Sequence, residues 1–182
     1  MRTTLNQIRT HRPCRDGWGK LLRHLNKTAA DDEPLLIETI LDSNGLDDAL
    51  WCLRAVDGRD RDLRLYAVWC ARRVQHLMSD PRSAAVLEEA ERYARGRATG
   101  EELGAAREAA ETAATTTEVV VAAAARAAAA LGAAADWAAR AAAAAARSAA
   151  GKKEQAAQAT ELRRICREIE AGRDPYPEED GR

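Results

Sequence analysis

Apolar residues recur every three or four positions along residues 16–97, a spacing that places them on one face of an α-helix. Several of these runs end at a glycine, as at Gly45, Gly58 and Gly96. Glycine ends many helices because it adopts the left-handed backbone conformation at little cost. The pattern predicts a compact bundle of short helices. The stretches that carry it are 16–27, 30–45, 46–58, 59–81 and 81–96.

Capping residues mark two of the expected helix starts. In the stretch 30–45, Asp31 or Asp32 is expected to cap a helix that has Pro34 in its first turn. Thr99 and Glu102 have the spacing of a capping box, in which each side chain bonds to the other residue's backbone N–H. We expect this capping box to begin the helical second half of the chain.

Alanine dominates the following residues, and it is the best helix former. The composition predicts one helix from residue 99 to about residue 131 and a second up to residue 150. Gly132 is either a turn between them or a glycine within one continuous helix, which costs about 1 kcal/mol relative to alanine. Gly151 is expected to stop the second helix, before a last helix over 152–172. The pattern predicts a long alanine-rich helical hairpin.

The predicted fold class is all-α. The one β-prone run, at 119–121, is flanked by strong helix formers. Four segments are expected: an irregular N-terminal arm (1–15), a helical N-terminal subdomain (16–97), an alanine-rich helical region (98–172) and a disordered acidic tail (173–182).

Charge and composition narrow the choice of partners. Lys and Arg number 28 against 29 Asp and Glu, for a net charge of -1, and this balance argues against a nucleic-acid binder. The alanine tract is interrupted by charged residues too often to cross a bilayer. The start of the chain lacks the apolar core of a signal peptide, and the four cysteines are far apart. We therefore expect a cytoplasmic protein with reduced thiols and no membrane contact.

No catalytic, metal or cofactor motif is recognisable. His11 and Cys14 lack the second pair that a zinc site needs. Cys70 and His76 lie on different faces of one expected helix, with no third orienting group. The stretch "DGWGK" follows no strand and is a poor phosphate cradle, and Asp47 and Asp48 suit the positive end of a helix dipole. The sequence therefore predicts no enzyme, no metal and no cofactor.

The predicted helix Leu63–Met78 brings together aromatic and basic side chains. Trp69, Arg72, Arg73 and His76 follow steps of three and four residues and share a face, with Tyr66 nearby. One interpretation is a tryptophan rim over the core, with the arginines paired to acidic residues at 57, 60 or 62. The others are a protein interface, or a site that stacks and pairs with an anionic planar ligand such as a nucleotide.

A second candidate surface follows the alanine tract. Arg126, Arg140 and Arg147 stand 14 and 7 residues apart, which is a heptad register and places them on one stripe. The stripe is either the solvated edge of an antiparallel helical hairpin or a charged ridge that recognises a partner.

Three stretches carry a family resemblance: "GLDDALWCLRAV", "RLYAVWCARRVQHLMSDPRS" and "AERYARGRATGEELGAAREAA". They resemble a set of small alanine-rich bacterial and phage proteins described as immunity proteins. The resemblance covers residues 13–110, and the alanine tail only by composition. Members often carry regularly spaced tryptophans in that tail, whereas here Trp137 stands alone. The resemblance implies a helical, non-enzymatic protein that neutralises a partner toxin, or another intracellular target when phage-borne.

The first functional hypothesis is thus a non-enzymatic intracellular protein that binds and neutralises a partner protein, as an immunity protein or in phage anti-defence. Its affinity would come from the surface around Trp69 and from exposed faces of the alanine helices. One alternative is a binder or sponge for an anionic, nucleotide-like signal. Another is a structural protein that forms homo-oligomers through its alanine-rich helices.

Overall fold

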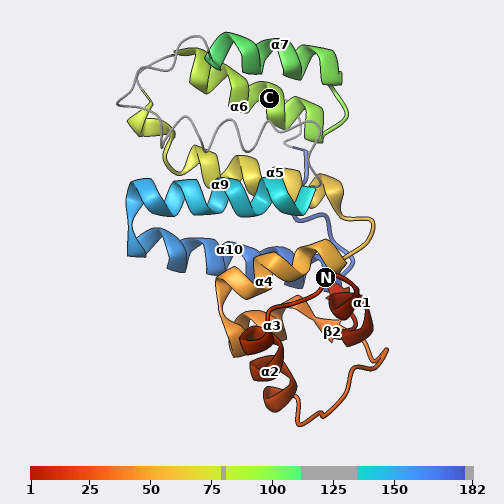
Figure 1. The fold of residues 1–182 in the computed structure, drawn as a ribbon. Coiled ribbons are helices and arrows are strands. Elements are labelled where there is room, and N and C mark those ends of the chain that lie inside the picture. Colours follow the sequence, from red (N-terminus) through yellow and green to blue (C-terminus); the bar gives the residue numbers. More distant parts are fainter. Residues whose placement is uncertain (79–80, 112–134, 179–182) are drawn as a thin grey trace. The chain divides into compact units, whose positions relative to one another are not determined.

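The structure is a computed structural model, and it describes residues 1–78, 81–111 and 135–178. Most of these residues are helical and very few are in strands, which confirms the all-α class (Figure 1). They divide into two compact units: unit 1 is Met1–Gly58 with Ala159–Arg182, and unit 2 is Arg59–Gln158. No helix in the described ranges is long and apolar enough to cross a membrane.

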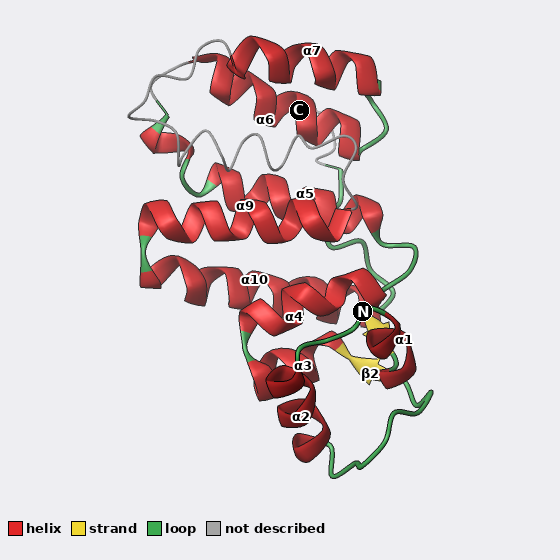
Figure 2. Ribbon diagram, in the orientation of Figure 1, coloured by secondary structure: helices red, strands yellow, loops and turns green. Residues whose placement is uncertain are grey.

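Unit 1 contains short helices and one two-stranded sheet. The sheet pairs Arg2 with Leu36 and Thr3 with Leu35 in antiparallel register (Figure 2). Thr3 also donates a hydrogen bond from its hydroxyl to the carbonyl oxygen of Ala55, at 2.6 Å. The elements of unit 1 are β1 (Arg2–Thr3), α1 (Leu5–Thr10), α2 (Arg15–His24), β2 (Leu35–Leu36), α3 (Ile37–Asn44), α4 (Leu46–Cys52), the 3-10 helix η1 (Leu53–Ala55) and the later part of α10 (Lys152–Glu170).

The first fifteen residues are ordered, which corrects the expected irregular arm. Thr4 caps α1 by accepting a hydrogen bond from the backbone N–H of Gln7, and Leu5 and Ile8 are buried. Strand β2 takes the place of the helical turn expected after Pro34, and helix α3 begins only at Ile37. Both corrections have one cause: β1 and β2 pair across more than thirty residues of chain, and local periodicity carries no sign of that pairing.

The C-terminal residues up to 178 also contact the body of unit 1. Arg164 donates a hydrogen bond to the carbonyl oxygen of Pro175 at 2.9 Å and lies over the ring of Tyr176. The Tyr176 hydroxyl donates to Glu161 at 3.2 Å. Residues 173–178 therefore correct the prediction of a disordered tail, because aromatic and arginine contacts hold them to helix α10.

Unit 2 contains the longer helices. Helix α5 packs against both α9 and α6, and α7 packs against α6 (Figure 1). The capping box is confirmed: Thr99 and Glu102 exchange backbone and side-chain hydrogen bonds at the start of α7. The elements are α5 (Asp60–Arg72), η2 (Gln75–Leu77), α6 (Pro81–Ala94), α7 (Gly100–Glu111), α9 (Ala135–Ala150) and the first residues of α10.

Helix α9 presents a face of methyl groups to its neighbours. The alanines of this face have at most 2% of their surface exposed: Ala135, Ala138, Ala139, Ala142, Ala143 and Ala146. Small side chains let two helix backbones approach closely. Gly151 ends α9 at φ +77°, as predicted, and α10 begins at the next residue.

The two units do not follow the segments expected at 16–97 and 98–172. Helix α5, from the first of these segments, packs on α9, from the second, so both belong to unit 2. The change in composition near residue 98 is therefore not a boundary between units. Gly132, the β-prone run at 119–121 and the expected helix beyond residue 111 lie outside the described residues.

The methyl face of α9 generates a stability prediction. Replacing Ala142, which is fully buried, with leucine overpacks the contact, and we expect a loss of about 1–3 kcal/mol in the free energy of unfolding. Ala144→Leu is the matched control, because Ala144 is exposed on the same helix and leucine is also a good helix former. Urea unfolding followed by circular dichroism measures both. Equal losses in the two variants would contradict close packing at Ala142.

Candidate functional site

The aromatic and basic residues predicted on α5 form a cluster in unit 2. The rings of Tyr66 and Trp69 stack with their centroids 6.1 Å apart, and the Arg73 guanidinium lies 5.4 Å from the centre of the Trp69 ring. Tyr66 is fully buried, while Trp69 is half-buried and Arg73 is exposed. We call these three residues the Trp69 cluster.

Both arginines of the predicted site already pair with glutamates. Arg73 Nε lies 3.1 Å from Glu154 Oε2, and Glu154 is only 3% exposed. Arg72 Nη2 lies 2.7 Å from Glu91 Oε2, on helix α6. These partners lie on other helices. They are not the acidic residues at 57, 60 or 62 that were expected for a tryptophan rim over the core. A glutamate therefore already balances the positive charge of each arginine, which weakens the attraction of an anionic ligand to this surface.

The Trp69 cluster continues into a buried polar network. Gln158 is fully buried, and its side-chain amide donates to the carbonyl oxygen of Ala143 at 3.0 Å and to Glu154 at 3.3 Å. Arg147 donates to Gln158 Oε1 at 2.9 Å, and the Tyr66 hydroxyl donates to the backbone oxygen of Gln158 at 3.3 Å. The network therefore ties helices α5 and α9 to the start of α10.

Three of the predicted site residues, Tyr66, Arg73 and Arg147, thus contact two residues that the sequence analysis did not identify, Glu154 and Gln158. A signal for these two was present. They stand four residues apart, and Leu162 lies four residues further on, so they extend the apolar stripe of α10 toward its N-terminus. Polar residues in line with a buried stripe indicate buried hydrogen bonds, because buried polar groups are almost always paired.

The remaining predicted residues lie elsewhere. His76 does not share the face of Trp69, because α5 ends at Arg72 and His76 is exposed on the 3-10 helix η2. Arg140 is half-buried on α9, beside the alanine face. Arg126 lies outside the described residues.

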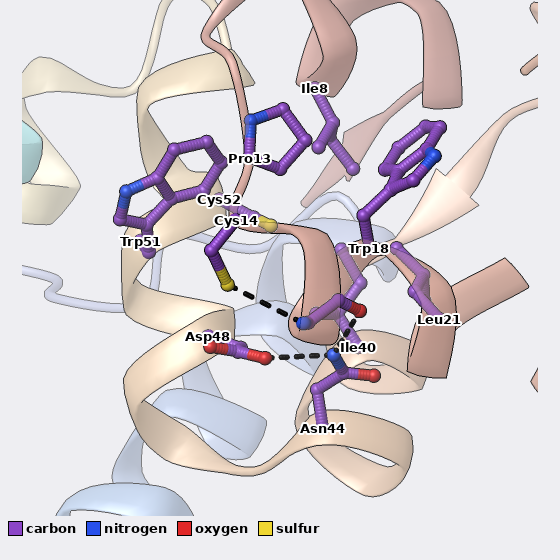
Figure 3. A pocket seen from close by; sticks show the side chains of 11 residues that line it. Ile8, Pro13, Cys14, Trp18, Leu21, Ile40, Asn44, Asp48, Trp51 and Cys52 are labelled. Carbon is purple, nitrogen blue, oxygen red and sulfur yellow. Dashed lines mark hydrogen bonds between the residues drawn. The ribbon is translucent and has the colours of Figure 1, made fainter.

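Unit 1 contains a cavity of about 160 Å³ that the sequence did not predict (Figure 3). Its walls are mostly apolar, with two tryptophan side chains and one carboxylate. Residues of α1, α2, α3 and α4 and of the α1–α2 turn form it: Ile8, Pro13, Cys14, Gly17, Trp18, Leu21, Ile40, Asn44, Asp48, Trp51 and Cys52. Because four separate helices supply the lining, no local motif could indicate it.

Hydrogen bonds fix the polar side of this cavity. Asn44 Nδ2 donates to the Gly17 carbonyl oxygen and to Asp48 Oδ2, both at 2.8 Å. A Cβ atom at Gly17 would lie 2.8 Å from Asp48 Oδ2, which is closer than carbon and oxygen normally approach. Glycine at this position therefore lets helix α2 lie directly against the Asp48 carboxylate.

The thiols differ in their accessibility. Cys14 is exposed at the cavity, whereas Cys52, Cys70 and Cys166 are buried. Burial raises the pKa of Cys52 to about 12 and that of Cys166 to about 11, which disfavours their thiolates. Cys70 has no exposed surface while His76 lies at the surface, so the structure does not bring them together in an open site. Within the described ranges, no group of three or more His, Cys, Asp or Glu side chains could hold a metal ion.

Comparisons with models of protein families, with curated proteins and with solved structures found no match. The resemblance to immunity proteins therefore stays a prediction from the sequence.

The polar network generates the next prediction. Gln158→Ala removes two hydrogen bonds, the one that Gln158 donates to the Ala143 carbonyl and the one that it accepts from Arg147, and we expect a loss of roughly 1–3 kcal/mol in the free energy of unfolding. Gln155→Ala is the control, because Gln155 is exposed on the same helix and should cost less than about 0.5 kcal/mol. Denaturant titrations compare the two variants. A neutral Gln158→Ala would show that the network contributes no stability.

Proposed function

We propose that this chain is a non-enzymatic binding protein that engages a partner protein through the outward face of helix α9 and neutralises it. The observation that carries the proposal is the exposure of Trp137. Among the large apolar side chains in the described part of the chain, only Leu77 and Trp137 are exposed, at 44% and 50%. Burying the exposed half of an indole against a partner is worth about 3 kcal/mol.

The surroundings of Trp137 support a protein partner. Ala141, Ala144 and Ser148 follow it at steps of three and four residues, on the side of α9 opposite the buried alanines. This side of α9 is therefore a strip of small side chains with one large aromatic ring, that of Trp137. Arg140 flanks the strip, and tryptophan and arginine are the residues most enriched at the energetic centres of protein interfaces.

The pairing of Arg72 and Arg73 with glutamates speaks against the nucleotide-sponge alternative. A site for an anionic ligand gains affinity from basic groups whose charge is not balanced, whereas here Glu91 and Glu154 balance the charge of both arginines. A protein partner that docks on α9 does not depend on these two arginines. The four free cysteines are consistent with action in the reducing cytoplasm.

The test is co-expression with the protein encoded beside this chain's gene, followed by titration calorimetry of the purified pair. We expect a stoichiometric complex, and Trp137→Ala should raise its Kd roughly thirtyfold, because truncating a central tryptophan costs at least about 2 kcal/mol. Leu77→Ala is the control, since Leu77 is the other exposed large apolar residue described; its effect should stay within about threefold.

Two results would contradict this proposal. A complex that Trp137→Ala leaves unchanged would remove α9 from the interface. A chain that forms no complex but shows concentration-dependent oligomers in light scattering would favour the self-associating alternative.

A further inference from the structure

The cavity of unit 1 has a chemical character that is independent of helix α9. None of its lining residues is basic, and Asp48 is its one charged group. No ion pair joins Asp48 to a lysine or arginine within the described ranges. The cavity therefore combines apolar walls with a carboxylate that no basic side chain neutralises.

The size of the cavity limits its occupant to a small molecule. Its volume of about 160 Å³ is close to that of an apolar protein cavity of about 150 Å³ that holds benzene. A single six-membered ring or a branched aliphatic group of similar size fits such a space. A nucleotide, a sugar chain or a peptide segment does not.

Asp48 is held in place with bonding capacity remaining. Asn44 Nδ2 donates to Asp48 Oδ2, and a carboxylate offers about four lone-pair positions on two oxygens. The Asn44 side-chain NH2 group donates to both Asp48 and the Gly17 carbonyl oxygen, so contacts within the fold orient this side chain. The carboxylate can accept further hydrogen bonds from a group that carries several N–H donors.

The aromatic side chains suit the apolar part of an occupant. Trp51 and Trp18 lie on opposite sides of the group of lining side chains, with Cys14 between them and Asp48 below Trp51 (Figure 3). Arg54 lies over the Trp51 ring at 4.3 Å, so one face of that ring is already covered by a cation. Trp18, which is half-buried and lies away from Asp48, offers an aromatic face to the apolar part of an occupant.

We propose that this cavity binds a small organic cation, a primary amine carried on an aromatic or branched apolar body. The body fills the space between Ile8, Leu21 and Ile40, and the ammonium group donates to Asp48. A neutral molecule of the same shape gains the apolar contact without the charge-assisted hydrogen bond. An anion of the same shape meets a carboxylate and no basic group.

Three probes of matched shape test this proposal: phenethylamine, 2-phenylethanol and phenylacetate. Titration calorimetry with the full chain should give the amine the lowest Kd, about tenfold below that of the alcohol, with no detectable binding of the acid. Asp48→Asn keeps an acceptor for Asn44 and should bring the amine and the alcohol to within about twofold. Asp47→Asn is the matched control, because Asp47 is the adjacent carboxylate and does not line the cavity; it should keep the tenfold preference.

Alkylation of Cys14 gives a readout in the unmodified chain. Cys14 is the one exposed cysteine of the four, and its side chain lines the cavity. The amine should slow its reaction with iodoacetamide, followed by mass spectrometry, more than the alcohol does at equal concentration. This measurement needs no variant, so it holds even if Asp48→Asn fails to fold.

The proposal is overturned if none of the probes binds, if the acid binds as tightly as the amine, or if Asp48→Asn keeps the preference for the amine. Trp137→Ala should leave amine binding unchanged, because Trp137 lies in unit 2 and outside the cavity lining. Loss of amine binding and loss of the α9 complex are therefore separate results.

Discussion

The contact between helix α5 and the alanine face of α9 constrains the rest of unit 2. Each buried methyl group contributes only about 0.8 kcal/mol, against about 1.5–3 kcal/mol for a buried leucine or valine. A face of methyl groups also lacks tall side chains that would fix one helix against another, because it has no ridges to fit into grooves. Such a face permits close approach but specifies little about register.

Hydrogen bonds supply the specificity that the methyl groups lack. Gln158 and Glu154 lie where the alanine face leaves room for them, and their partners on α5 and α9 are Tyr66, Arg73, Arg147 and the Ala143 carbonyl. An unpaired polar group at this depth costs about 1–3 kcal/mol, so a shift of one helix along another breaks several bonds at once. Arg73 and Arg147, which were predicted to bind a ligand or partner, therefore help to hold the helices together.

Local signals in the sequence predicted what depends on neighbouring residues. The stops at Gly45, Gly96 and Gly151 and the capping box at Thr99 are present, because each needs only a few consecutive residues. The end of α5 at Arg72 was missed, since no glycine or proline marks it. Strand pairing, the held C-terminal residues and the cavity were missed as well, because each joins separate segments of the chain rather than neighbouring residues. The residue types of the Trp69 cluster were identified correctly, whereas their partners were not, because those partners come from α6 and α10.

The location of the cavity follows from side-chain size. Along one stripe of α10 the chemistry changes from Glu154 and Gln158 to Leu162 and Ile165, and the boundary between the units falls between Gln158 and Ala159. Unit 2 includes the buried methyl face of helix α9. Unit 1 packs around large, irregular side chains, among them both tryptophans of the cavity, and these require matched partners to fill the space between them. The cavity lies beside the point where Gly17 brings helix α2 against Asp48, so the part of the chain with the larger side chains has the space for a small molecule.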